Sequence, residues 1–193
     1  MLSILLLNTK RVVITGGPST GKTSVIKSLE ELGFTCVHEL IRSMTSAEKN
    51  EENADVFVTN PILSVNDPKK FNQQLLEGRI EQYKNTQNFD IDLVFFDRGI
   101  PDVHAYMNCF GLPYDEKFEE PCYTYRYHQI FLFPPWRDIH VIDNERFESY
   151  EESVQIYECL KKTYENFGYP ITQVPKGSVE ERTTFIKDFL NLS

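Results

Sequence analysis

Short apolar runs alternate with longer stretches of helical periodicity along this chain. Continuous apolar runs are typical of strands that are buried on both faces of a sheet. The runs predicted as strands are 11–15, 34–38, 91–97, 129–133 and 169–174. The predicted helices follow them: one ends at Leu32, one begins at 39–44, and the others cover 68–87, 101–110, 147–167 and the residues after Ser178. This alternation predicts an α/β fold, a three-layer sandwich with a five-stranded parallel sheet and helices on both faces, formed by residues 1–193 as a single domain.

Local signals set several of the helix ends. Asp67 with Pro68 is typical of a helix start, and Ser178 with Glu181 forms a capping box. The apolar positions expected to face the core are Val25, Ile26, Leu29 and Leu32 in the first helix and Phe185, Ile186, Phe189 and Leu190 in the last. Residues 48–66 are polar and predicted to be irregular, and the aromatic segment 112–127 is ambiguous.

The segment between the first strand and the first helix matches G-x-x-x-x-G-K-[ST], the pattern of a phosphate-binding loop. Glycine permits a tight turn in which successive N–H groups surround an anion at a helix N-terminus. We therefore predict a P-loop NTPase with ATP as the default nucleotide. The predicted nucleotide-binding residues are Gly16, Gly17, Pro18, Ser19, Thr20, Gly21, Lys22, Thr23 and Ser24. Lys22 is expected to reach the outer phosphates, and the Thr23 hydroxyl is expected to bind Mg²⁺.

Charged residues follow the next two predicted strands, and the carboxyl ends of parallel strands are where such sheets bind ligands. Asp97 is a candidate Mg²⁺ ligand opposite Thr23, with a surface salt-bridge residue as the alternative. Arg98 has the planar guanidinium that suits a phosphate or carboxylate on the acceptor, with a structural ion pair as the alternative. Glu39 could accept a proton from an acceptor hydroxyl, or it could simply be an acid favoured near a helix N-terminus. Arg42, one turn later, could reach a substrate anion.

A polar segment follows the fourth strand, which Pro134 and Pro135 end. We predict a flap near 134–147 that closes over the nucleotide. Its arginines, Arg146 and to a lesser degree Arg137, are candidates to stabilise charge on the transferred phosphoryl group, with solvent exposure as the alternative.

Overall composition restricts the classes of partner and the cellular location that we expect. A net charge of −9 disfavours a general nucleic-acid surface. The four cysteines are scattered without a C-x-x-C pair, which favours reduced thiols and a cytoplasmic location. The apolar residues 1–7 are too few for a membrane span and are interpreted as an extension leading into the first strand. The sequence offers no prediction of oligomeric state.

Several segments together resemble one family. They are GGPSTGKTS, HELIR, FDRGIPDVHAY, the segment from FLFPPW to DNER, and VPKGSVEER. This set resembles the AAA-domain group of predicted ATPases that includes the ribosylnicotinamide kinase domain of bacterial NAD regulators, over about residues 10–190. More distantly, E-x-x-R and DR resemble elements of nucleoside and nucleotide monophosphate kinases. The resemblance implies that Glu39 and Arg98 contact the acceptor and that Asp97 binds the metal or acts as a base.

Departures from related patterns limit the function. Asp97 is followed by Arg98 rather than by a second acid, which argues against an unfolding motor, and the chain has no Asn-Lys-x-Asp motif for guanine. No feature specific to nicotinamide is present either. Two functions stay open: a small-molecule kinase that transfers the γ-phosphate of ATP to a nucleoside- or nucleotide-like acceptor, and a nucleotide-dependent switch with slow hydrolysis and a protein or lipid partner. In the kinase, Lys22, Glu39, Asp97, Arg98 and Arg146 would be the catalytic residues.

Overall fold

A parallel sheet forms the centre of the computed structural model, which describes residues 9–40, 67–88, 91–141 and 148–192. Its strands are β1 (Lys10–Gly16), β2 (Thr35–Val37), β3 (Leu93–Asp97), β4 (Gln129–Phe133) and β5 (Ile171–Gln173). They lie in the order β2-β3-β1-β4-β5, and all four pairings are parallel. The predicted five-stranded parallel sheet is confirmed. Because β1 lies between β3 and β4, the loop that follows β1 emerges at the middle of the sheet edge.

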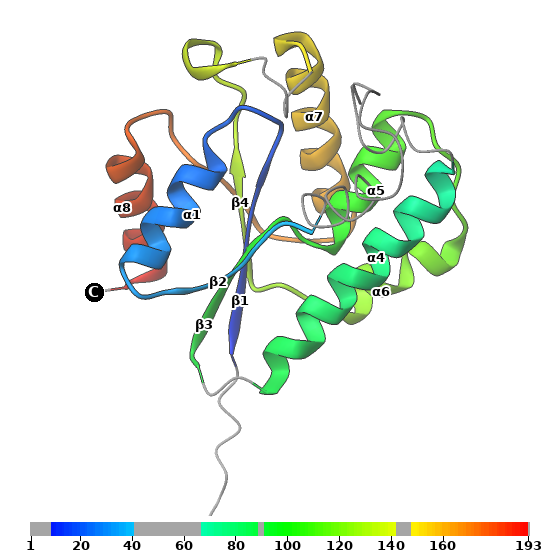
Figure 1. Ribbon diagram of the computed structural model, residues 1–193, viewed down its shortest axis with the longest axis horizontal. Helices are drawn as coiled ribbons and strands as arrows, with labels where there is room; N and C mark the ends of the chain where they lie inside the picture. The colour runs from blue at the N-terminus through cyan, green and yellow to red at the C-terminus, as the bar shows by residue number, and fades with distance from the viewer. Residues whose placement is uncertain (1–8, 41–66, 89–90, 142–147, 193) are drawn as a thin grey trace, which may run out of the picture.

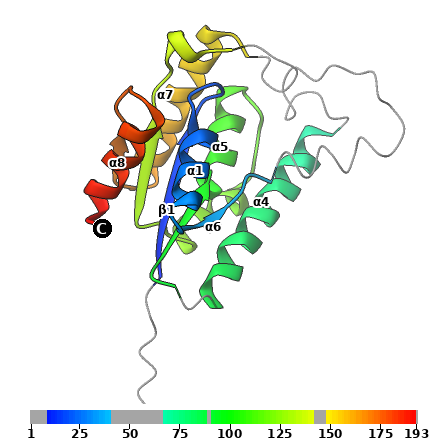
Figure 2. The same cartoon turned by 60° about the vertical axis from the view of Figure 1, so that its left-hand side comes forward.

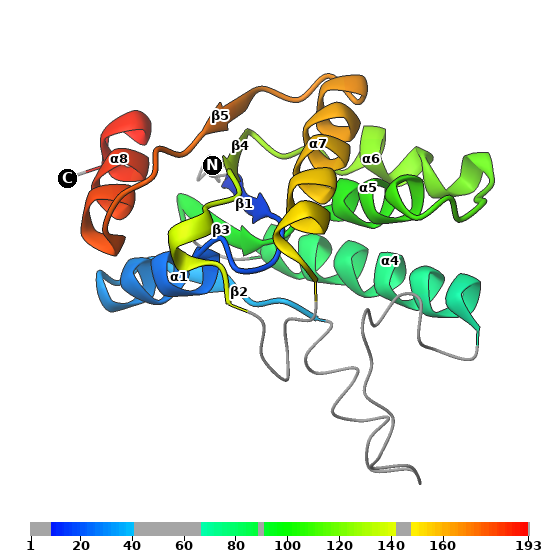
Figure 3. The ribbon, with the colours of Figure 1, turned by 90° about the horizontal axis from the view of Figure 1, so that it is seen from above.

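Helices cover both faces of the sheet (Figures 1 and 2). The helices are α1 (Lys22–Glu31), α4 (Pro68–Asn85), α5 (Ile100–Cys109), α6 (Glu120–Thr124), α7 (Tyr150–Asn166) and α8 (Val179–Leu190). α1 and α8 pack on one face, and α4, α5 and α7 pack on the other, as the view from above shows (Figure 3). The described helices include none with an apolar stretch long enough to cross a bilayer.

Side chains of β1 show why the strands read as continuous apolar runs. Val12 and Ile14 point into the core formed with α1 and α8, while Val13 points into the core formed with α4, α5 and α7. All three are fully buried. Successive strand residues point to opposite faces, so a sheet covered on both faces requires apolar residues at every position.

Two predicted core positions are wrong. Leu32 is 53% exposed because α1 ends at Glu31 and Leu32 lies beyond it as the C-cap. Phe189 is 47% exposed because the buried stripe of α8 runs through Arg182, Thr183 and Ile186, which places Phe189 at its margin.

Helix and strand ends differ in detail from the prediction. α7 begins at Tyr150 rather than at residue 147, because Ser149 forms a capping box with Glu152. The capping box of Ser178 and Glu181 is confirmed. The strand predicted at 169–174 is shorter, and the ambiguous segment 112–127 contains a 3₁₀ turn at Glu116–Phe118 and α6. The helix predicted to begin at 39–44 falls mostly, and the irregular stretch 48–66 falls wholly, outside the described residues.

Candidate functional site

The loop between β1 and α1 is bent at its glycines. A β-carbon on Gly16 would lie 2.6 Å from the Phe133 carbonyl oxygen, so only glycine fits against β4 there. Gly21 has a left-handed backbone (φ 81°), and a β-carbon on it would lie 2.5 Å from Arg182 Nη1. Residues with side chains are strained in both situations. The two glycines of the motif are therefore required by the packing around the loop as well as by its turn.

Three segments distant in sequence hold this loop. Ser153 of α7 donates a hydrogen bond to the Pro18 carbonyl (3.2 Å), and Arg182 of α8 donates one to the Thr20 carbonyl (3.0 Å). Ser19 donates to the carbonyl of Val141, which lies in the predicted flap (2.7 Å). Arg182 is 5% exposed. The bonds from Ser153 and Arg182 satisfy two loop carbonyls from outside, which leaves the loop N–H groups as the donors available to an anion.

Lys22 is the cation of the loop. Its Nζ donates to the Gly17 carbonyl (2.6 Å) and to Thr20 Oγ1 (3.3 Å). Burial lowers the pKa of Lys22 from 10.5 to about 7; Arg98 lowers it too, while Asp97 and Glu39 act in the opposite direction. Nearby phosphate would favour the charged amine. Thr23 is half-buried in the first turn of α1, and Ser24 beside it is exposed.

Glu39 and Arg98 form an ion pair beside the loop. Glu39 Oε1 lies 2.5 Å from Arg98 Nε, and the two side chains are 16% and 10% exposed. Arg98 Nη1 also donates to the Gly16 carbonyl (3.3 Å) and to Tyr106 Oη (3.1 Å). The structure thus brings together two of the residues predicted at neighbouring strand ends. It also shows that the Arg98 guanidinium is held by protein groups on several sides.

The backbone of Arg98 is unusual. Its φ of 71° lies in the left-handed region, which residues with a β-carbon seldom adopt, and its N–H donates to the Ile14 carbonyl (3.0 Å). Burial opposes its charged form, but Glu39, Tyr106 and Asp102 raise the pKa of Arg98 well above the usual value. Such conformations cluster at functional sites, where the surrounding structure holds them.

Asp97, the last residue of β3, is 8% exposed, and its Oδ1 is buried without a hydrogen-bond partner among the described residues. Burial raises the pKa of Asp97, and Glu39 raises it further, while Lys22, Arg98 and Arg79 oppose this. A buried carboxylate oxygen that lacks a partner costs free energy unless a cation or a proton satisfies it. The prediction that Asp97 binds a metal or a proton therefore fits its surroundings.

Asp102 is a residue that the sequence reasoning missed. It is 2% exposed and accepts hydrogen bonds from Thr15 Oγ1 (2.5 Å), Tyr164 Oη (2.5 Å) and the Gly99 N–H (2.9 Å). Its Oδ1 also lies 3.5 Å from Arg98 Nη1. The available signal was its place four residues after Arg98, in the first turn of a helix, where an acid faces back toward the strand end.

Of the three arginines predicted in the flap and after the second strand, one lies in the described residues. Arg137 lies in a 3₁₀ turn (Arg137–Ile139), forms an ion pair with Glu151 (3.1 Å), and has a side chain that is 70% exposed. It is not in contact with the loop in this structure. Arg42 and Arg146 lie outside the described residues.

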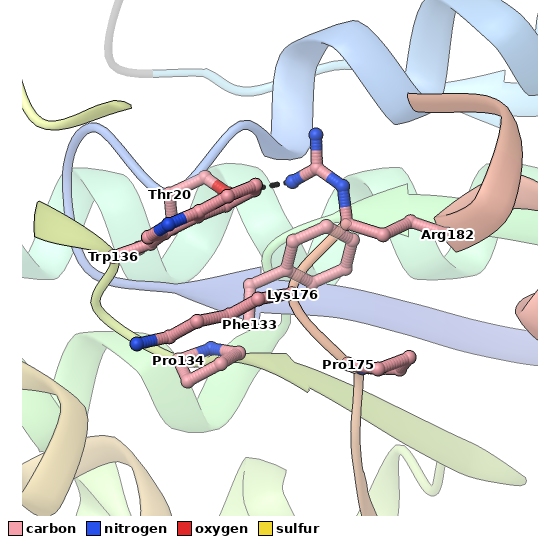
Figure 4. Close-up of a pocket in the computed structure, with 7 residues that line it drawn as sticks. All are labelled: Thr20, Phe133, Pro134, Trp136, Pro175, Lys176 and Arg182. Atoms are coloured by element: carbon pink, nitrogen blue, oxygen red, sulfur yellow. Dashed lines mark hydrogen bonds between the residues drawn. The ribbon is translucent and has the colours of Figure 1, made fainter. Parts of the chain in front are cut away.

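A pocket lies beside the phosphate loop (Figure 4). Its lining comes from the loop, from the end of β4 and the residues after it, from the segment between β5 and α8, and from α8 itself: Thr20, Phe133, Pro134, Trp136, Pro175, Lys176 and Arg182. The Arg182 guanidinium carbon lies 5.7 Å from the centres of both the Phe133 and the Trp136 rings. The space between these side chains is too small to hold a nucleobase in this structure, but the Trp136 ring and the Arg182 guanidinium are groups on which an aromatic base stacks.

Comparisons with known proteins agree with this geometry. No curated protein matches the sequence. Among solved structures, a deoxyadenosine kinase from M. mycoides with bound products has a TM-score of 0.65 at 14% identity, covering 94% of this chain and 98% of that one. NadR in complex with NR has a TM-score of 0.64 at 17% identity, and this chain spans only 50% of its length. The match to NadR covers 96% of this chain. A thymidylate kinase from Candida albicans has a TM-score of 0.65 at 13% identity, and the match covers 95% of this chain and 91% of that one.

At these identities the likeness concerns the fold, which is that of the nucleoside and nucleotide kinases. The match to a family profile shows more directly which family the chain belongs to. The profile described as AAA domain matches residues 11–182, which includes the phosphate loop, Glu39, Asp97, Arg98 and Arg182. The chain therefore belongs to the AAA domain family.

Proposed function

We propose that this protein is a small-molecule kinase that transfers the γ-phosphoryl group of ATP to a hydroxyl or phosphate of a nucleoside- or nucleotide-like acceptor. The observation that supports it most is the Glu39–Arg98 ion pair (2.5 Å), which lies beside the phosphate loop rather than within it. A loop that only binds nucleotide does not require a second charged site. Kinases on the same fold include those whose solved structures contain a nucleoside or nucleotide.

The donor side is assigned to the phosphate loop. Its N–H groups and Lys22 would bind the phosphates, and the Trp136 ring and the Arg182 guanidinium beside the loop would stack on the base. Thr23 and Asp97 would hold Mg²⁺, a cation that usually binds through one or two protein groups together with substrate phosphates. The unpartnered Oδ1 of Asp97 fits that role. When bound, the metal would neutralise charge on the transferred phosphoryl group.

The acceptor side is assigned to Glu39 and Arg98. The acceptor oxygen attacks the γ-phosphorus, the bond from that phosphorus to the bridging oxygen breaks, and ADP leaves with the electron pair. The Glu39 carboxylate takes the proton of an acceptor hydroxyl, with Asp97 as the second candidate. Arg98 orients Glu39 and contacts the acceptor. Arg146 and Arg137 of the flap would add positive charge as it closes. This chemistry depends on positioning and electrostatics.

The setting that we propose is the cytoplasm. All four cysteines are free thiols, and burial raises the pKa values of Cys122, which is fully buried, and of Cys36 and Cys109, which are half-buried. Thiols in this state fit a reducing compartment.

The test is ADP release from Mg-ATP in the presence of a panel of nucleosides, nucleotides and sugar alcohols. We expect turnover that depends on the acceptor, and a loss of about 10²-fold to 10⁴-fold in kcat for Glu39→Gln with ATP affinity preserved. Exposed Glu158→Gln, on α7, serves as the matched control. Tight ATP binding without stimulation by any acceptor would instead support the switch. The aromatic segment 112–127 gives the switch little support, because Phe118, Cys122 and Tyr127 are buried in the core.

A further inference from the structure

Two cysteines that the proposed kinase site does not use lie against each other. Cys109 is the last residue of α5, and Cys159 lies within α7. The Cys109 thiol donates a hydrogen bond to the Cys159 sulfur. Both cysteines are half-buried, so part of each side chain can be reached from solvent. The chain therefore holds a pair of adjacent thiols at an accessible position.

The packing of α5 against α7 agrees with this contact. The two helices share one buried cluster, and Cys109 packs against it (Figure 3). A second contact joins them near the start of α5, where Tyr164 donates to Asp102. Between the two contacts the chain advances by about 10 Å along α5 and, in the opposite direction, by about 8 Å along α7. Similar distances are expected for antiparallel neighbours, so the thiol contact fits the helix interface.

The other two cysteines have no such neighbour in the described chain. Cys36, on β2, donates to the Ile26 carbonyl (3.9 Å), and Cys122 of α6 is fully buried. The ionisable groups that act on these two thiols are acids and, for Cys122, Arg126; no second cysteine is among them. Among the described residues, two thiols thus meet only where α5 packs on α7.

Adjacent thiols favour one oxidation product over the others that cysteine can form. A hydroperoxide converts a thiol to a sulfenic acid, and a second thiol in contact converts the sulfenic acid to a disulfide before further oxidation. The sulfurs must approach to about 2.05 Å, and a hydrogen-bonded pair is already in contact. In a reducing compartment such a bond is transient and responds to oxidants, rather than being a permanent part of the fold.

We propose that Cys109 and Cys159 are a redox modification site at which a hydroperoxide forms a reversible disulfide between α5 and α7. This site goes beyond the proposed function and does not depend on it. The bond would fix two helices that both reach the nucleotide site. α7 donates to the phosphate loop through Ser153, and Asp102 of α5 lies beside the Arg98 guanidinium.

The reaction balances with hydrogen peroxide as the oxidant. Burial and the hydrogen bond to Cys159 raise the pKa of Cys109 to about 12, so Cys109 keeps its proton at neutral pH and Cys159 attacks first. The Cys159 sulfur bonds to one peroxide oxygen, the O–O bond breaks, and the other oxygen leaves as water with the thiol proton. The Cys109 sulfur then attacks the resulting sulfenic acid, and its hydroxyl leaves as water with the Cys109 proton. The two sulfurs together lose two electrons, which the peroxide gains.

The test treats the full chain with hydrogen peroxide and counts its thiols after denaturation. We expect the four thiols to become two, with peptide mapping that links Cys109 to Cys159, and dithiothreitol should restore all four. Cys36→Ser keeps the pair and should form the same bond. Disulfides between chains, links that include Cys36 or Cys122, or sulfinic acid without the Cys109–Cys159 link would each overturn the proposal.

Serine variants test the order of attack. In Cys109→Ser the sulfenic acid on Cys159 has no partner thiol, and we expect dimedone to trap it. In Cys159→Ser the remaining Cys109 should be labelled about tenfold more slowly. Equal or faster labelling of Cys109 would reject Cys159 as the attacking sulfur.

Thermal unfolding shows whether the bond forms in the folded protein. The disulfide closes a loop of about 50 residues in the unfolded chain, so the oxidised protein should unfold about 5–15 °C above the reduced protein. Differential scanning fluorimetry without reductant measures this shift, and Cys109→Ser treated in the same way should show none. An unchanged or lower unfolding temperature in the oxidised wild type would mean that the bond distorts the helix packing, which would overturn a site in the native structure.

Discussion

At the scale of single residues, the site is a set of buried charges with unequal compensation. Arg98 is paired with Glu39 and bonded to Gly16 and Tyr106, whereas one oxygen of Asp97 has no partner in the described ranges. The amine of Lys22 contacts carbonyl and hydroxyl groups of its own loop. The groups that have hydrogen-bond or ion-pair partners hold the geometry of the site, and the groups that lack a partner are those that a ligand would stabilise.

Lys22→Ala tests the donor assignment. Removing a charged hydrogen bond to phosphate should cost about 1.5–3 kcal/mol, which is about tenfold to 150-fold in ATP affinity. Isothermal titration of the folded variant with Mg-ATP checks this, and Lys27→Ala, exposed on the same helix, is the matched control. Unchanged ATP affinity in Lys22→Ala would reject the phosphate-loop assignment.

His104 gives a prediction of pH dependence. It is fully buried on α5, and burial lowers its pKa below 6.5 despite the contact of its Nε2 with the Phe118 carbonyl. Below pH 6.5 the unfolded chain binds a proton that the folded chain excludes. The free energy of unfolding should therefore fall as pH decreases from 6.5, by up to about 1.4 kcal/mol per pH unit from this group, and be regained above pH 6.5.

Chemical denaturation between pH 5 and 7.5 measures this slope. His104→Phe, which fits the aromatic surroundings, should flatten the slope relative to the wild type. Lys27→Ala, at an exposed position of α1, should leave it unchanged. An identical slope in wild type and His104→Phe would contradict the prediction.

At the scale of elements, the carboxylate of Asp102, in the first turn of α5, accepts hydrogen bonds from three parts of the structure. Asp102 connects β1 through Thr15, the turn before α5 through the Gly99 N–H, and α7 through Tyr164. Because Arg98 lies in the same turn, the start of α5 determines where its guanidinium points. The helices α5 and α7 also pack along each other through their buried faces.

Asp102→Asn should destabilise the protein by about 1–3 kcal/mol, since the amide nitrogen would face hydrogen-bond donors and leave buried groups unsatisfied. Tyr164→Phe removes one of these bonds and should cost about 1 kcal/mol. Asp188→Asn, exposed on α8, should change stability by less than about 0.5 kcal/mol. Denaturant titration ranks the three variants, and an Asp102→Asn effect no larger than that of Asp188→Asn would refute the assignment.

At the scale of the whole molecule, the phosphate loop joins the two layers of helices. It emerges from the central strand, and both α7 on one face and α8 on the other donate hydrogen bonds to it. A ligand that binds the loop therefore stabilises contacts on both faces of the sheet. Binding that favours the folded state raises the unfolding temperature by mass action.

Mg-ATP at about one hundred times its Kd should stabilise the fold by about 2.7 kcal/mol, which is about 5–11 °C for a chain of this size. Differential scanning fluorimetry measures the shift. Lys22→Ala should lose about half to nine-tenths of it at the same ATP concentration, whereas Lys27→Ala should retain it. Absence of a shift in the wild type at millimolar Mg-ATP would count against ATP as the donor.

The sequence by itself determined the features whose physics is local. The phosphate loop follows from glycine and lysine spacing, the capping box of Ser178 and Glu181 from two residues three apart, and the parallel sheet from apolar runs alternating with helical periodicity. Position at strand ends was enough to predict that the phosphate loop, Glu39 and Asp97 converge, because parallel strands end at the same edge, and Lys22 of the loop interacts electrostatically with both acids.

Only the tertiary structure decided which partners these residues have. Arg182 reaches the loop from 162 residues away, Asp102 joins Thr15 and Tyr164, and Arg79 lies buried with two of its guanidinium nitrogens unpartnered within the described chain. In sequence these residues look like ordinary polar positions of helices. Whether a side chain is buried, paired or left unpaired depends on atoms contributed by distant segments, and no local pattern of the chain encodes their positions.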